Sequence, residues 1–174
     1  RRRGQVREEM ELQAVRERMA EYLGENGVEA VCAYPEEKRK RRTGAVCAVS
    51  VRSCQGGPGG FRDYLGERFD EKSGKWQELY GRRIVLTFGL DLYAPGAGGA
   101  EAIQTAFDKL AQALQQGGPP GLKTLELSCG ETQFDREAGL CRRAVEAQCQ
   151  GYLYAVAEEG GGFLDFIVRG ESRL

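Results

Sequence analysis

One stretch, from Arg83 to Tyr93, constrains the fold more than any other part of the sequence. Large apolar residues occupy every second position, and side chains on a β-strand alternate between its two faces. A strand gathers these residues into one apolar ridge, whereas a helix would spread them around its circumference. The ridge consists of Ile84, Leu86, Phe88, Leu90 and Leu92. Each such side chain contributes about 1.5–3 kcal/mol when buried, so the sequence predicts a long, half-buried strand.

A turn and a helix follow this strand. Pro95 to Gly99 breaks the alternation, and Ala100 to Gln115 continues with apolar residues at helical spacing. This helix is predicted to cover the ridge through Ile103, Ala106, Phe107, Leu110 and Leu114. Backbone amides at Gly96 to Gly99 could hold an anion, but the pattern favours a plain turn.

The elements on either side of this unit are predicted from the same periodicities. Val6 to Leu23 has helical spacing, and the five residues before it are expected to be flexible. Strands are predicted at Glu29 to Tyr34, at Gly44 to Ser53 and through much of the last third of the chain. Phe163 to Arg169 is expected to close that last part as a hairpin strand. The missing initiator Met indicates a trimmed or processed N-terminus.

These elements predict a single α+β domain over residues 1–174. A chain of 174 residues that is 41% apolar suits one core. Short turns between strands favour a twisted, mostly antiparallel sheet, with the helices packed mainly on one face. No apolar run approaches the roughly 18 residues that span a bilayer, so we expect a soluble protein made in a cytoplasm, without a membrane partner.

Residues 54–80 are predicted to be a long irregular loop or insertion. The segment opens with the glycine-rich run Gln55 to Gly60 and then carries several aromatic residues. Long loops in compact domains tend to be functional or disordered, and the aromatic residues argue against plain disorder. The segment is expected either to fold back on the domain or to contact a partner.

Catalytic chemistry finds little support in the sequence. The chain has no histidine, which excludes Ser-His-Asp and Cys-His catalysis, and no glycine-rich run continues into a nucleotide-binding Lys-Ser/Thr. A hydrolase with paired carboxylates stays an alternative, but nothing in the spacing selects a pair from Asp91, Glu126, Glu131 and Glu146. We expect no enzyme activity, no catalytic residues and no cofactor.

The cysteines are interpreted as core residues rather than ligands. No Cys-x-x-Cys pair occurs, and without histidine the common zinc spacings are absent, so no metal site is expected. Cys47 shares a strand face with Val49 and Val51, and Cys149 shares one with Val145 and Ala147, as expected of small buried side chains.

Charge is balanced overall but concentrated at one place. Lys and Arg number 25 against 26 Asp and Glu, which gives no global case for nucleic acid. Lys38 to Arg42 is a run of five basic residues. It suits either phosphates or a protein partner, so a nucleic-acid-binding module is one alternative function.

The order of elements resembles the tail terminator and minor tail proteins of long-tailed bacteriophages and related prophages. The resemblance extends from about Val6 to Glu159. It is carried by Trp76 with the following strand Ile84 to Pro95, and by the acidic turn Asp135-Arg136-Glu137 before Gly139-Leu140. The basic run, the long 54–80 segment and the added strand at Phe163 to Arg169 depart from smaller members.

The resemblance implies a structural protein of virion assembly. Such proteins form a ring, commonly a hexamer, that caps the tail tube and meets the head-tail connector protein. The implied location is the bacterial host cytoplasm during assembly and then the virion tail, without specific nucleic-acid binding. Another tail-tube or head-completion protein of the same fold is the nearest alternative. The residues expected to contact subunits or partners are Lys38, Arg39, Lys40, Arg41, Arg42, Phe61, Tyr64, Phe69 and Trp76.

Overall fold

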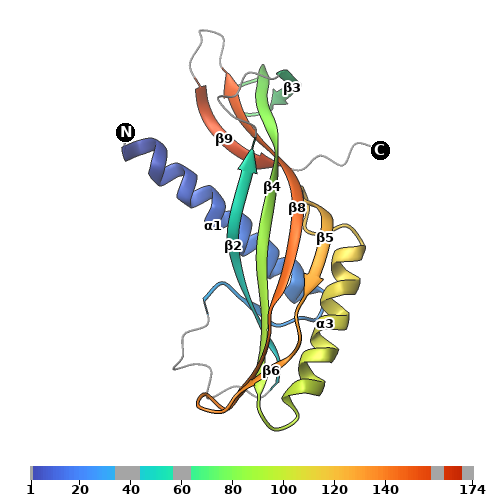
Figure 1. Cartoon of the computed structure of the whole chain (residues 1–174). Helices are drawn as coiled ribbons and strands as arrows, with labels where there is room; N and C mark the ends of the chain where they lie inside the picture. Colours follow the sequence, from blue (N-terminus) through green and yellow to red (C-terminus); the bar gives the residue numbers. More distant parts are fainter. Residues whose placement is uncertain (1, 34–43, 57–63, 158–162, 170–174) are drawn as a thin grey trace.

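The computed structural model describes residues 2–33, 44–56, 64–157 and 163–169. Within these ranges the chain forms one mixed α+β domain with two helices and a nine-stranded sheet (Figure 1). The elements are α1 (Arg2–Glu25), β1 (Ala30–Val31), β2 (Val46–Gly56), β3 (Tyr64–Asp70), β4 (Lys75–Pro95), α3 (Gly99–Gln115), β5 (Lys123–Cys129), β6 (Gln133–Asp135), β7 (Leu140–Arg143), β8 (Val145–Ala157) and β9 (Phe163–Arg169). Neither helix of the described ranges is long and apolar enough to cross a membrane.

Strand β4 is the centre of the sheet. Along one edge it pairs first with β3 and then with β2, and along the other it pairs with β8 and then β7. All of these pairings are antiparallel, and β1 pairs with β2 in parallel. The predicted mostly antiparallel sheet is therefore confirmed.

The predicted ridge forms the core. Ile84, Leu86, Phe88, Leu90 and Leu92 are each at most 2% exposed. They belong to one buried cluster with Val15, Met19 and Leu23 of α1 and with Ile103, Leu110 and Leu114 of α3.

The two helices meet over the ridge. The hydroxyl of Tyr22 in α1 donates a hydrogen bond to the carbonyl oxygen of Ala113 in α3, at 2.6 Å. Both helices thus cover the same face of the sheet, as predicted, and the side chains at alternate positions of β4 face away from them.

The turn between β4 and α3 needs glycine for close packing. Gly98 has φ +69° as the N-cap of α3, and Gly99 is buried. A Cβ atom at residue 99 would lie 2.9 Å from Sγ of Cys141, and one at residue 96 would lie 2.6 Å from the ring of Phe134. These contacts account for the glycine-rich run as a packed turn.

The prediction of an irregular connection at residues 54–80 is wrong over most of its length. Strand β2 continues to Gly56, and residues from Tyr64 to Tyr80 form an antiparallel β-hairpin. Strand β4 consequently starts at Lys75 rather than at Arg83. This outcome results from two strand pairings, that of β2 with β4 and that of β3 with β4. Both depend on strand register, which hydrophobic periodicity does not report.

Element ends differ elsewhere. Helix α1 begins at Arg2 rather than Val6 and so includes residues expected to be flexible, and β1 covers only Ala30–Val31. Strand β5 has a bulge between Thr124 and Glu126, and Leu125 there is 48% exposed. The predicted closing strand is confirmed, since β9 pairs antiparallel with β8.

Candidate interaction surface

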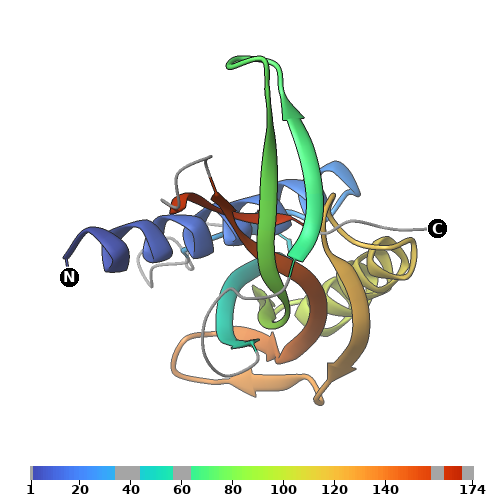
Figure 2. The ribbon, with the colours of Figure 1, turned by 90° about the horizontal axis from the view of Figure 1, so that it is seen from above.

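The hairpin formed by residues Tyr64 to Tyr80, called the arm below, extends away from the body of the sheet (Figure 2). The last residue of β8 to pair with β4 is Ala157, opposite Glu78, so the part of the arm beyond Glu78 lies outside that pairing. Three aromatic side chains on the arm are exposed to solvent: Tyr64 by 56%, Phe69 by 50% and Trp76 by 65%. Together they form the largest group of exposed large hydrophobic side chains in the described ranges.

Phe69 and Trp76 form a cross-strand pair. They are direct partners in the register of β3 and β4, and their ring centroids lie 5.6 Å apart at an interplanar angle of 64°. Edge-to-face aromatic pairs contribute about 0.5–1.5 kcal/mol beyond the area that they bury. The pair therefore stabilises the arm while both rings stay half or more exposed.

The turn at the tip of the arm is closed by Asp70. Its carboxylate accepts hydrogen bonds from the backbone N–H of Lys72 at 3.1 Å and from the hydroxyl of Ser73 at 2.8 Å. Gly74 supplies the left-handed residue, with φ +67°, and its N–H donates to the carbonyl oxygen of Asp70. The hydrogen bond from Ser73, followed by that from Lys72, lowers the pKa of Asp70 below its ordinary value. The tip is thus a well-defined turn.

The arm unites three of the predicted contact residues. Tyr64, Phe69 and Trp76, which are separate aromatic residues in the sequence, come together on one hairpin. The other predicted contacts, Phe61 and the basic run Lys38, Arg39, Lys40, Arg41 and Arg42, lie outside the described residues.

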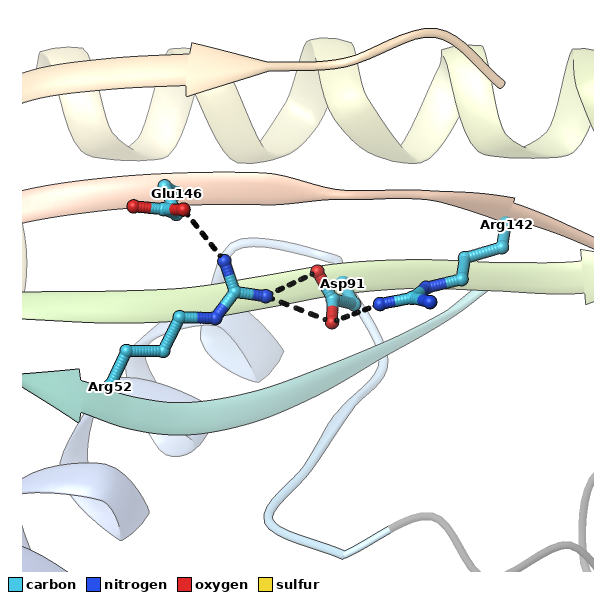
Figure 3. A network of polar contacts seen from close by, with 4 residues as sticks. All are labelled: Arg52, Asp91, Arg142 and Glu146. Atoms are coloured by element: carbon cyan, nitrogen blue, oxygen red, sulfur yellow. Dashed lines mark hydrogen bonds and ion pairs between the residues drawn. The ribbon is translucent and has the colours of Figure 1, made fainter. Parts of the chain in front are cut away.

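A network of charged side chains covers the sheet face opposite the helices (Figure 3). Arg52 of β2 donates to both carboxylate oxygens of Asp91 in β4, at 3.0 and 3.1 Å, and to Glu146 of β8 at 2.9 Å. Arg142 of β7 also donates to Asp91, at 3.2 Å. The Asp91 side chain is only 14% exposed, against 47% for Glu146. The positive charges of the two arginines therefore compensate the negative charge of the less accessible carboxylate.

This network was not predicted from the sequence. Among the four carboxylates considered there, Asp91 and Glu146 come together on Arg52, whereas Glu126 and Glu131 are exposed. Two arginines against two carboxylates make the network neutral, and it joins four strands of the sheet. Its geometry suits a structural role, because each carboxylate is already paired with a cation.

A hollow of about 500 Å³ lies between the segment Gly27 to Glu29, which follows α1, and helix α3. Its polar side chains are Glu29, Glu101, Thr105 and Lys109, and the rest of its lining is small or apolar. The hydroxyl of Thr105 donates a hydrogen bond to the backbone carbonyl oxygen of Glu101, one turn earlier in α3, at 3.1 Å. Across the described ranges no three His, Cys, Asp or Glu side chains are arranged to hold a metal ion.

The six cysteines differ in burial. Cys47, Cys141 and Cys149 are buried, as the interpretation as core residues expects. Cys54 and Cys129 are exposed, which that interpretation did not anticipate, and Cys32 is half-buried. All six cysteines lie in the described ranges, and none of them forms a disulfide bond. Burial raises the pKa of Cys149 to about 11, and burial followed by the charge of Asp91 raises the pKa of Cys47. The buried thiols are accordingly poor nucleophiles at neutral pH.

The sequence matches no protein-family model and no curated protein.

Proposed function

We propose that this protein is a structural subunit of a phage or prophage tail, a tail terminator that forms a ring at the end of the tail tube. The ring, commonly of six copies in such proteins, would stop the growth of the tube and present a surface to the head-tail connector protein. The element order, the α+β fold and the exposed arm support this proposal.

The single observation that carries the proposal is the Phe69–Trp76 pair on the arm. Exposed aromatic side chains grouped on one element mark surfaces that bind another protein. A two-stranded hairpin is only marginally stable by itself, so a projecting arm is best explained by a partner that covers it. Aromatic residues are also enriched at the centres of protein interfaces.

A ring further requires two different surfaces on each subunit. Head-to-tail contacts close into a ring when a whole number of the rotations that relate neighbouring subunits adds up to one full turn. The arm supplies one such surface at one end of β4. The exposed edges of the sheet and the outer faces of the helices lie away from it and leave room for the second (Figure 1).

The test compares the wild-type chain with an arm variant, Phe69→Ser together with Trp76→Ser. Leu125→Ser is the matched control, because Leu125 is about as exposed as Phe69 but lies on β5 in the body of the sheet. Masses from light scattering and electron micrographs of purified tail tubes are recorded for all three proteins.

Wild type and Leu125→Ser are expected to form rings of one discrete mass, alone or on tube ends, whereas the arm variant stays monomeric with an unchanged melting temperature. Binding along the whole length of the tubes would instead favour a tail-tube protein. A wild-type chain that neither forms rings nor binds tubes would refute the proposal.

A further inference from the structure

The arm and the hollow lie toward opposite ends of the molecule (Figure 1). Trp76 is the second residue of β4, and the strand continues to Pro95, three residues before Gly98 in the lining of the hollow. At about 3.3 Å per residue, this length of strand spans roughly 60 Å. The arm is a paired hairpin rather than a loose loop, so its rings cannot fold back into the hollow of their own subunit. A second copy of the chain can bring the two surfaces together.

The hollow has room for large side chains. Its volume of about 500 Å³ falls within the range of roughly 300–1,000 Å³ that buries most of a drug-sized ligand. Two aromatic rings are smaller than such a ligand, so the Phe69–Trp76 pair can enter it. Half of the lining consists of glycine and alanine, whose short side chains leave this space open: Gly27, Ala45, Gly98, Ala102 and Ala106.

The charges of the two surfaces are complementary. Glu101 is exposed in the lining of the hollow, and Lys72 and Lys75 are exposed beside the rings at the tip of the arm. Among the described residues none of these three side chains has an ion-pair partner. A buried indole N–H also needs an acceptor, which a carboxylate of the hollow can supply to Trp76. Both the apolar and the polar groups of the arm therefore find counterparts in the hollow.

We propose that the hollow binds the Phe69–Trp76 pair of a neighbouring copy. The contact places Lys72 and Lys75 of one subunit beside Glu101 of the next. It joins the arm of one copy to the opposite end of another, so it is a head-to-tail contact and supplies both of the surfaces that a ring requires. This inference rests on the proposed function for its biological setting and names the partner of the arm.

Trp76 makes the contact measurable, because it is the only tryptophan in the chain and its side chain is 65% exposed in the single subunit. The emission of the full chain and its quenching by acrylamide are recorded over a series of protein concentrations. As the concentration rises, we expect the emission to shift to shorter wavelength and the quenching to weaken. A Trp76 that stays equally accessible up to the highest soluble concentration would overturn the inference.

A substitution that fills the hollow tests the binding site. Thr105 is exposed and lines the hollow, so Thr105→Phe is expected to obstruct it without disturbing the core. Gln112→Phe is the matched control, because Gln112 is exposed on the same helix but lies outside the lining. Trp76 should stay accessible at all concentrations in Thr105→Phe and become protected as in wild type in Gln112→Phe. Equal protection in both variants would contradict the site.

Charge reversal tests the ionic part of the contact. Glu101→Lys in one protein, and Lys72→Glu with Lys75→Glu in another, each place like charges on both sides of the contact. Each variant alone should associate about tenfold more weakly than wild type. In an equimolar mixture the reversed arm meets the reversed hollow, and the unchanged arm meets the unchanged hollow. The mixture is expected to associate as wild type does, and a mixture no better than its separate components would refute the pairing.

The masses from light scattering separate this inference from the proposed function. Rings that form while Trp76 stays accessible would refute the contact between arm and hollow and leave the terminator proposal standing. Protection of Trp76 in open chains that never close into rings or bind tubes would support the contact and refute the terminator proposal.

Discussion

Arg52 lies directly over Gly89 on the sheet face opposite the helices. A Cβ atom at residue 89 would lie 2.6 Å from Nε of Arg52 and 2.5 Å from Oγ of Ser50. The bare glycine therefore leaves the space in which Arg52 crosses β4 to reach both Asp91 and Glu146 (Figure 3).

Gly89→Ala is expected to lower the free energy of unfolding by about 1–3 kcal/mol, because Arg52 or Ser50 must move and the network loosens. Urea denaturation measures this change. The control is the same substitution in a Ser50→Ala, Arg52→Ala background, where the crowding is gone. An equal loss of stability in both backgrounds would show that the contact is not its cause.

Phe88→Ala should destabilise the subunit far more. Phe88 is the largest fully buried side chain of the core, so its removal leaves a cavity that costs about 3–5 kcal/mol. The midpoint of urea denaturation reports the loss. Leu125→Ala is the matched control: on an exposed bulge, it should change stability by at most about 0.5 kcal/mol. Equal effects of the two substitutions would contradict the assignment of the core.

The hydrophobic ridge and helix α3 were predictable from the sequence because each depends on the periodicity of buried residues. Phe88 and its neighbours alternate, and Ile103, Leu110 and Leu114 recur at helical spacing. These patterns record which side of an element meets the core.

The arm and the charged network were not predictable in the same way. Phe69 and Trp76 are exposed, so no burial pattern marks their strands, and their pairing depends on the turn at Asp70. Arg52 and Glu146 are 94 residues apart, and the sequence shows only that each faces solvent. Contacts across strands depend on register, which a single sequence leaves open.

The thiols should differ in reactivity according to burial. Iodoacetamide at pH 8 is expected to modify the exposed Cys54 and Cys129 and to spare Cys47 and Cys149, because a buried thiol stays protonated. Mass spectrometry of the digested protein identifies the modified residues. Rapid modification of Cys149 in the folded chain would contradict its burial.

Stability should fall at alkaline pH. The pKa of Cys149 rises from 9.0 to about 11 on folding, so its protonated thiol favours the folded state. This contribution is complete below pH 9 and is lost as the pH rises from about 9 to 11. Melting temperatures at pH 8 and pH 10.5 measure the loss. In Cys149→Ala the drop between these two pH values should be smaller than in wild type.

Asp70→Ala should loosen the tip of the arm and leave the core intact. The variant loses the acceptor for Lys72 and Ser73, so hydrogen exchange should quicken at residues 72–77 while the melting temperature stays constant. Asp70→Asn, which keeps one acceptor oxygen, should exchange at an intermediate rate. Since hydrogen bonds lower the pKa of Asp70, wild type should hold the turn above its ordinary pKa of 3.8 and lose it as the pH falls further.

Strand β4 runs without interruption from Lys75 at the arm to Pro95 at the start of the turn into α3. The same backbone that presents Trp76 to solvent thus buries Phe88 and carries Asp91. A subunit held at its arm would therefore be aligned by the twist of this one strand. The angle between neighbouring copies, and with it the curvature and diameter of any assembly that they build, would be encoded in the coiling of β4.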